Sequence, residues 1–166
     1  MWIRSETGAD HAAIRAVVDA AFAQAPYASG TESRIVEALR REDALSISLV
    51  ADIDGRVAGH VAISPVSIAG TTGWHGLGPV AVAPAEQGHG IGSALVQAAL
   101  SELRTAGSLG CVVLGEPGYY ARFGFDAVEG LSYPDAPPGY FMALVFGETV
   151  PRGVVSYHPA FSLANG

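Results

Sequence analysis

The residues best suited to chemistry form a glycine-rich turn, Gln87-Gly88-His89-Gly90-Ile91-Gly92-Ser93, which follows an apolar segment ending at Val82. Glycines let consecutive backbone N–H groups converge on one point, and their missing β-carbons allow a phosphate to approach. A helix that begins inside the turn adds N–H groups without partners and the partial positive charge of its dipole. The turn therefore predicts an anion site, without a cationic side chain, that suits a pyrophosphate.

Two other interpretations of this turn stay open on the residues alone. The dinucleotide-binding turn of Rossmann folds has Gly-x-Gly-x-x-Gly directly after its strand. Here Ser93 holds the place of the third glycine, and residues 83–87 separate the strand from the turn. The third interpretation is a turn whose glycines only let a helix pack against a sheet.

A second segment with chemical potential is Gly115-Glu116-Pro117-Gly118-Tyr119-Tyr120-Ala121-Arg122-Phe123-Gly124-Phe125. A phenol has an ordinary pKa of about 10, against about 8.5 for a thiol, so a neutral tyrosine can protonate a departing thiolate. The alternative is an aromatic cluster beneath a sheet, which we favour for Tyr119, Phe123 and Phe125. Arg122 suits either a phosphate contact or a surface ion pair.

Both segments resemble signatures of the GNAT superfamily of acetyltransferases. Residues 87–92 are similar to its Gln/Arg-x-x-Gly-x-Gly/Ala motif, and a Val-x-Val-x-Pro strand end precedes them. Residues 119–125 resemble the Tyr-Tyr-x-Arg-Phe-Gly-Phe motif of a bacterial branch of small predicted N-acetyltransferases. The resemblance follows the order of elements over residues 1–130, and it is specific only in these two segments.

The resemblance implies that acetyl-CoA is the cosubstrate. Backbone N–H groups of the turn would hold its pyrophosphate, and the strand edge at residues 80–82 would pair with the pantetheine and direct an N–H at the acetyl carbonyl. The hydroxyl of Tyr120 would face the CoA sulfur. The expected cofactor-binding residues are Val80, Ala81, Val82, Gln87, Gly88, His89, Gly90, Ile91, Gly92, Ser93, Tyr119 and Tyr120.

The implied reaction is direct transfer of the acetyl group to an amine of a small molecule or peptide, within a ternary complex. An alkyl amine arrives mostly protonated, so a base must accept its proton. The candidates are Glu116, just past a strand end, and Glu32, at the start of a helix; His75 is a weaker one. With Tyr120, the two glutamates form the expected catalytic set. The alternative function is a non-catalytic acyl-CoA sensor or interaction module, which would not need Tyr120.

The elements that must position these residues follow from the spacing of apolar side chains. Helical spacing predicts a first helix that includes residues 14–22 and further helices over residues 31–41, 90–106 and 119–123, with a break at Pro26 to Gly30. A capping-box pattern, Thr7 to Asp10, begins the first helix. Strands are expected at residues 2–6, 46–53, 57–68, 77–82, 111–114, 140–146 and 154–157, with a turn at Asp54-Gly55 and a loop at residues 69–73. The resemblance implies an α/β GNAT fold. Its sheet is twisted, mixed and mostly antiparallel, its parallel central strands splay apart, and about four helices flank it.

Composition limits the other classes of function. We expect one domain over residues 1–166, without a signal peptide or membrane span, and therefore a cytoplasmic protein. The net charge is −7 and every basic residue is an arginine, which argues against a nucleic-acid partner and mildly favours a cationic substrate. A single cysteine, Cys111, and the histidine spacing predict no metal site. The resemblance allows a homodimer without specifying one.

Overall fold

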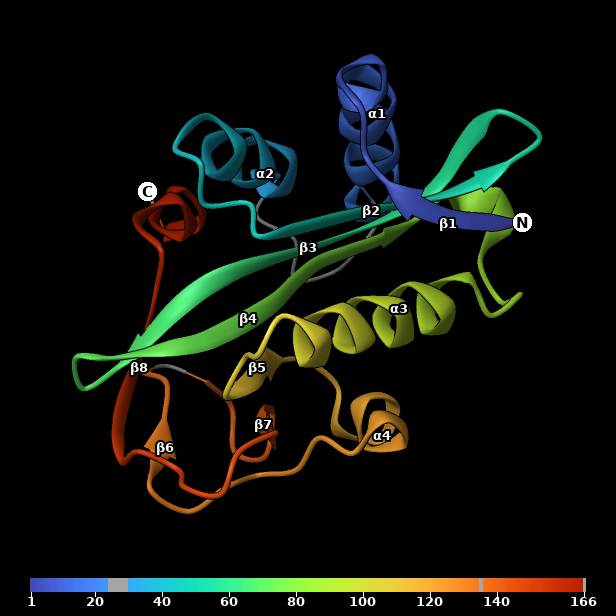
Figure 1. Ribbon diagram of the computed structural model, residues 1–166. Coiled ribbons are helices and arrows are strands. Elements are labelled where there is room, and N and C mark those ends of the chain that lie inside the picture. Colours follow the sequence, from blue (N-terminus) through green and yellow to red (C-terminus); the bar gives the residue numbers. More distant parts are fainter. Residues whose placement is uncertain (24–29, 135, 166) are drawn as a thin grey trace.

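A mixed β-sheet forms the centre of the fold. The computed structural model describes residues 1–23, 30–134 and 136–165 (Figure 1). In that part of the chain the strand order is β1-β2-β3-β4-β5-β7, with β8 beside β3 and β6 beside β8. The pairs are antiparallel except β4–β5 and β6–β8. The strands are β1 (Trp2–Ser5), β2 (Ile47–Ile53), β3 (Arg56–Ile68), β4 (Thr71–Val82), β5 (Gly110–Leu114), β6 (Leu131–Ser132), β7 (Phe141–Val145) and β8 (Gly153–Tyr157).

Helices cover both faces of this sheet. Helices α1 (His11–Phe22) and α2 (Glu32–Arg41) lie on one face, and α3 (Ile91–Thr105) lies on the other (Figure 1). Helix α4 (Pro117–Tyr120) follows β5. Short 3₁₀ helices are η1 (Gly8–Asp10), η2 (Pro84–Glu86), η3 (Ala121–Phe123) and the seven-residue η4 (Pro159–Asn165). Within the described residues, no helix is both long and apolar enough to cross a bilayer.

The alternation of side chains along β3 divides the core between the two faces. Val61 and Ile63 pack with α3, whereas Ala62 packs with α1. Farther along the α1 face of β3, Val66 joins a third cluster with Trp74, which is 1% exposed. Strand β3 therefore anchors helices on both faces of the sheet.

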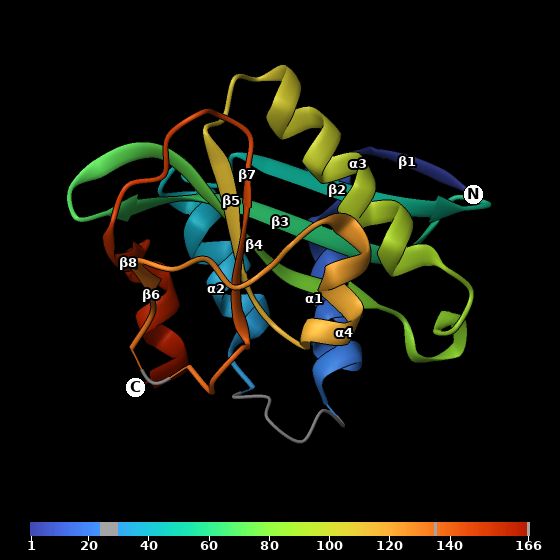
Figure 2. The same cartoon turned by 90° about the horizontal axis from the view of Figure 1, so that it is seen from below.

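The central parallel pair separates soon after it forms. Strands β4 and β5 pair only through Trp74–Gly76 against Gly110–Val112. Strand β5 then continues with β7 as far as Leu114, opposite Phe141, and Figure 2 shows this pair running steeply across the rest of the sheet. The expected splay of the central strands is confirmed, and it leaves β4 from Leu77 to Val82 without a strand partner on that edge among the described residues.

Several element boundaries differ from those expected. The expected loop at residues 69–73 is wrong: Ala69 and Gly70, at φ +48° and +85°, form the whole turn, so β4 already begins at Thr71. Strand β6 and the turn η4 were not expected from the sequence. The expected break at Pro26 to Gly30 lies outside the described residues except for Gly30.

A polar network ties the first strands to α2. The Arg40 guanidinium donates twice to the Glu6 carboxylate, both bonds at 2.9 Å. The Ser48 hydroxyl bonds to the same carboxylate and lies 2.8 Å from His60 Nε2. Burial opposes ionisation of Glu6, yet its hydrogen bonds to Arg40 and Ser48 keep its pKa below the ordinary value. His60 is 0% exposed, and burial lowers its pKa to about 4.

This burial predicts a specific loss of stability in acid. The pKa of His60 is about 4 in the folded protein against an ordinary 6.5. Between those values the unfolded chain binds a proton that the folded chain rejects, so the free energy of unfolding falls as the pH falls. The loss should be on the order of 3 kcal/mol. Urea unfolding at several pH values should show this slope in the wild type and a shallower one in His60→Gln. An unchanged slope in the variant would contradict the assignment.

Candidate functional site

The glycine-rich turn connects β4 to α3 through a backbone that favours glycine. Pro84 opens the turn η2 after β4, and Gly88 then adopts φ +83°. Gly90, at φ +82°, is the N-cap of α3. A side chain at either glycine would be strained whatever the surrounding space, because L-residues rarely adopt this left-handed conformation. The expected function of these glycines in shaping the turn agrees with its geometry.

Most amides of this turn have no acceptor among the described residues; the exception is the Gln87 N–H, which donates to the Pro84 carbonyl at 3.4 Å. The first backbone bond of α3 runs from Ala94 N–H to the Gly90 carbonyl at 3.1 Å. Among the described residues, no hydrogen bond within the protein is formed by the N–H groups of residues 88–93. The positive end of the α3 dipole adds to these donors. The turn can therefore receive an anion such as a diphosphate without breaking any bond of the fold.

Tyr119 and Arg122 bring α4 and η3 against the same turn. The Tyr119 hydroxyl lies 3.4 Å from Ser93 Oγ, and a β-carbon at Gly92 would lie 3.1 Å from that hydroxyl. The Arg122 guanidinium stacks 4.4 Å from the Tyr119 ring centre. A pocket joins these groups, and its lining residues are Val82, Glu86, Gln87, Gly88, Gly90, Ile91, Gly92, Ser93, Tyr119 and Arg122.

The open edge of β4 leads away from this pocket. The Ala83 N–H donates to the Ala58 carbonyl of β3 at 2.8 Å. Because backbone groups alternate between the two edges of a strand, those of Ala81 also face β3. Those of Val80 and Val82 face the edge that β5 has left. Two of the three expected β4 residues therefore present their backbone to the splay, and Ala81 does not.

The side chain of Gln87 supports this assignment of edges. Its Nε2 donates to the Val82 carbonyl at 3.1 Å, so that carbonyl points away from β3. His89 lies at the exposed tip of the turn, where its Nδ1 is 3.2 Å from the Glu86 carbonyl. Gln87 thus braces the turn against β4, and the His89 ring stays outside the pocket lining.

Tyr120 approaches the splay from the α3 face. Its ring packs with the core cluster of that face and lies 5.9 Å from the ring of Phe125, nearly perpendicular to it at 84°. Any side chain at Gly115 would overlap the Tyr120 ring. Burial, with smaller contributions from Tyr119 and Cys111, raises the pKa of Tyr120 to about 12. The phenol therefore keeps its proton at neutral pH and can donate it.

The two candidate bases occupy different environments. Glu116 is exposed and is the N-cap of α4, where its carboxylate accepts the Tyr119 N–H at 2.9 Å. Glu32 begins α2 on the opposite face of the sheet, and its Oε1 is buried. His75 lies within β4, and its Nδ1 is 2.8 Å from Ser108 Oγ in the paired part of the strand. The two glutamates thus belong to different elements, α2 and α4. Glu116 also caps α4, a contact that the sequence did not predict.

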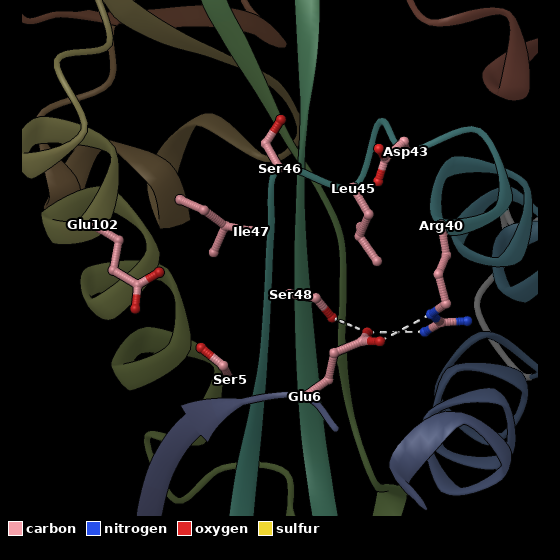
Figure 3. A pocket seen from close by; sticks show the side chains of 9 residues that line it. All are labelled: Ser5, Glu6, Arg40, Asp43, Leu45, Ser46, Ile47, Ser48 and Glu102. Atoms are coloured by element: carbon pink, nitrogen blue, oxygen red, sulfur yellow. Dashed lines mark hydrogen bonds and ion pairs between the residues drawn. The ribbon is translucent and has the colours of Figure 1, made fainter. Parts of the chain in front are cut away.

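A second concavity lies at the edge formed by β1 and β2. Figure 3 shows Glu6 bonded to Ser48 and Arg40 at its base, with Ser5, Ile47 and Glu102 around it. Its central carboxylate is already held by Arg40 and Ser48. The pocket at the turn, in contrast, combines unpaired amides with a free strand edge. Arg122 also lines the pocket at the turn, where its guanidinium stacks on the Tyr119 ring. The sequence had left this residue open between a phosphate contact and a surface ion pair.

Known proteins share both the sequence and this arrangement. Residues 13–125 match the acetyltransferase (GNAT) family. The uncharacterized N-acetyltransferase YhbS of Escherichia coli K12 is 38% identical over 128 residues, covering 76% of this chain and 74% of that protein. A GNAT family acetyltransferase from Brucella melitensis, solved in complex with acetyl-CoA, is 50% identical with a TM-score of 0.87, covering 96% of this chain and 97% of the other.

The structure of E. coli YhbS in complex with CoA aligns equally well. Its TM-score is 0.89 at 32% identity, covering 97% of this chain and 91% of the other. The family match spans both segments that the sequence singled out, the turn at residues 87–93 and the tyrosine segment that ends at Phe125. Sequence motifs, fold and relatives agree, and the chain belongs to the GNAT family of acetyltransferases.

Proposed function

We propose that this protein transfers the acetyl group of acetyl-CoA directly to an amine of a small molecule or peptide, within a ternary complex. The observation that carries the proposal is the open edge of β4, which runs from the unpaired amides of the turn towards the splay that Tyr120 borders. Acetyl-CoA in the Brucella relative and CoA in the E. coli relative support this choice of cosubstrate.

The described residues fit coenzyme A along this line. The amides of residues 88–93 would hold the diphosphate, and the Arg122 guanidinium at the same pocket would add a charged donor. The Val80 and Val82 backbone groups would bond the amides of the pantetheine arm as a neighbouring strand does. The thioester then lies beyond Val80, towards the point where β4 and β5 begin to pair.

The proposed chemistry needs one donor at the carbonyl oxygen and one at the sulfur. A neutral amine nitrogen attacks the thioester carbon, and the Val80 N–H, the free donor of the β4 edge nearest the thioester, stabilises the negative charge that develops on oxygen. The C–N bond forms, the C–S bond breaks, and the Tyr120 hydroxyl gives its proton to the departing thiolate. The proton lost from the nitrogen returns through a base or water, so Tyr120 is restored and no acyl-enzyme forms.

We further propose that a glutamate accepts the proton of the arriving ammonium, and Glu116 and Glu32 both stay candidates. Glu116 follows β5 closely, whereas Glu32 belongs to the face that carries α1 and α2.

The net charge of −7 favours a cationic acceptor over an anionic one. The whole chain, residues 1–166, is proposed to act as a single domain.

The competing proposal is an acyl-CoA sensor without turnover. It would keep the turn and the free β4 edge, but it gives no reason for a partly buried phenol that keeps its proton beside the splay. Free-thiol release from acetyl-CoA, measured with a panel of amines, separates the two. Amine-dependent release supports the enzyme, and tight binding of CoA without release on the whole panel supports the sensor.

The turn generates a binding prediction with a matched control. Gly90→Ala forces a side chain onto φ +82° at the pocket, whereas Gly107→Ala does the same at φ +83° beyond the other end of α3. Neither added β-carbon meets an atom within 4 Å. Both variants should lose about 1–2 kcal/mol of stability, but only Gly90→Ala should weaken CoA binding by calorimetry, on the order of tenfold. Equal CoA affinity in the two variants would contradict the assigned site.

Tyr120 generates a kinetic prediction. Removal of the phenol hydroxyl in Tyr120→Phe should lower kcat about 10²–10⁴-fold, the range for a lost general acid, and leave the dissociation constant of CoA nearly unchanged. Loss of the group that donates a proton should also remove the alkaline limb of the pH–rate profile. Tyr119→Phe is the control, because its hydroxyl lies beside Ser93 at the turn. Wild-type kcat in Tyr120→Phe would refute the role.

The two glutamates can be separated by amide substitutions. The carbonyl oxygen of Glu116→Gln can still accept the Tyr119 N–H, so the α4 cap survives while the base is lost. We expect one of Glu116→Gln and Glu32→Gln to remove the acid limb of the pH–rate profile while CoA affinity is retained. Acid limbs in both variants would show that neither carboxylate is the base and would favour a water chain.

A further inference from the structure

Tyr157 lies at the point where the two central strands begin to separate. It belongs to β8 and pairs with Val66 of β3. Its ring crosses to β4, because a β-carbon at Gly76 would lie only 2.6 Å from the Tyr157 Cε1 atom. Gly76, opposite Val112, is the last residue of β4 that pairs with β5. The ring therefore covers the closed end of the splay, where only glycine leaves room for it.

Neighbouring aromatic rings hold Tyr157 in this place. Tyr133 meets it edge to face, with ring centres 5.1 Å apart at 78°, and Phe161 packs 5.0 Å away. Its ring joins the core cluster that also contains Trp74. Aromatic contacts of this geometry favour one orientation. The end of the splay is therefore closed by a fixed ring and not by a mobile side chain.

Two partly buried tyrosines pack near the splay from opposite faces of the sheet. Tyr120 packs with the cluster beneath α3, whereas Tyr157 packs with the cluster on the other face. Burial raises the pKa of Tyr157 far above its ordinary value. Cys111, Tyr133 and Tyr120 contribute less to this rise in pKa than burial does. The two rings therefore pack against opposite faces of the sheet, with Tyr157 over the last β4 residue that pairs with β5.

The direction of the bound acyl group follows from the proposed function, on which this inference rests. A pantetheine that runs from the turn along Val82 and then Val80 aims its thioester at Gly76. The acyl chain then extends towards the closed end of the splay. There the paired backbones of Gly76 and Val112 block it in the plane of the sheet, and a longer chain would have to leave that plane.

We propose that Tyr157 is a specificity-determining residue that limits the acyl group to about two or three carbons. Its ring fills the space over Gly76 into which a longer chain would turn on the face of α1 and α2. A closed apolar pocket discriminates about 10–200-fold for each methylene that it cannot admit. The wild type should therefore use acetyl-CoA well, propionyl-CoA less, and butyryl-CoA poorly.

The test compares kcat/KM for acetyl-CoA and butyryl-CoA with one amine that the wild type acetylates. Tyr157→Leu keeps an apolar side chain but removes the ring, so the ratio of acetyl to butyryl kcat/KM should fall at least tenfold. Tyr157→Phe keeps the ring and should keep the wild-type ratio. A wild-type ratio in Tyr157→Leu, or a wild type that prefers butyryl-CoA, would overturn the inference.

A second measurement does not depend on turnover, so it tests the role of Tyr157 even if the variant is a slow enzyme. Calorimetry should show that Tyr157→Leu binds butyryl-CoA more tightly relative to acetyl-CoA than the wild type does, with CoA itself bound equally by both proteins. If Tyr157→Leu does not fold, Tyr157→Met replaces it in both measurements. An unchanged affinity ratio refutes the role of Tyr157 alone, whereas failure of the wild type to bind CoA refutes the proposed function.

Discussion

The short pairing between β4 and β5 is the constraint on which the site depends. Three residue pairs join the strands, and β5 then leaves with β7 as its only continuing partner in the described chain. Pro79 has no N–H to offer a further strand. The backbone groups of Val80 and Val82 therefore meet an open edge in the interior of a sheet, where a strand-like ligand can complete the ladder.

The rest of the fold holds this edge open and equips both of its faces. Helix α3 packs beneath β2, β3 and β4 and brings its unpaired amides to the end of the edge. The network of Arg40, Glu6, Ser48 and His60 joins α2 to the first three strands on the other face. Both faces of the sheet beside the splay are thus braced, and Tyr120 and Tyr157 pack on opposite faces of it.

The sequence predicted most of this arrangement, and the misses have physical causes. Period-2 and period-3.6 patterns located the long elements, and the motif at residues 87–93 located the turn. The start of β4 was missed because Thr71 to Gly76 is poor in apolar residues, although it pairs on both edges. The strand that ends at Tyr157 was expected, but its contact with Gly76 was not, since it joins residues far apart in the chain. The cap formed by Glu116 was equally invisible, because a carboxylate at a strand end suits either role.

Residue-resolved amide hydrogen exchange, with and without CoA, tests the open edge most directly. The account predicts that CoA slows exchange at Val80, Val82 and the amides of residues 88–93, which form no bond within the described protein. It also predicts little change at Ala81 and Ala83, whose N–H groups already face β3. Protection confined to other segments, or the same change at Ala81 as at Val80 and Val82, would contradict the account.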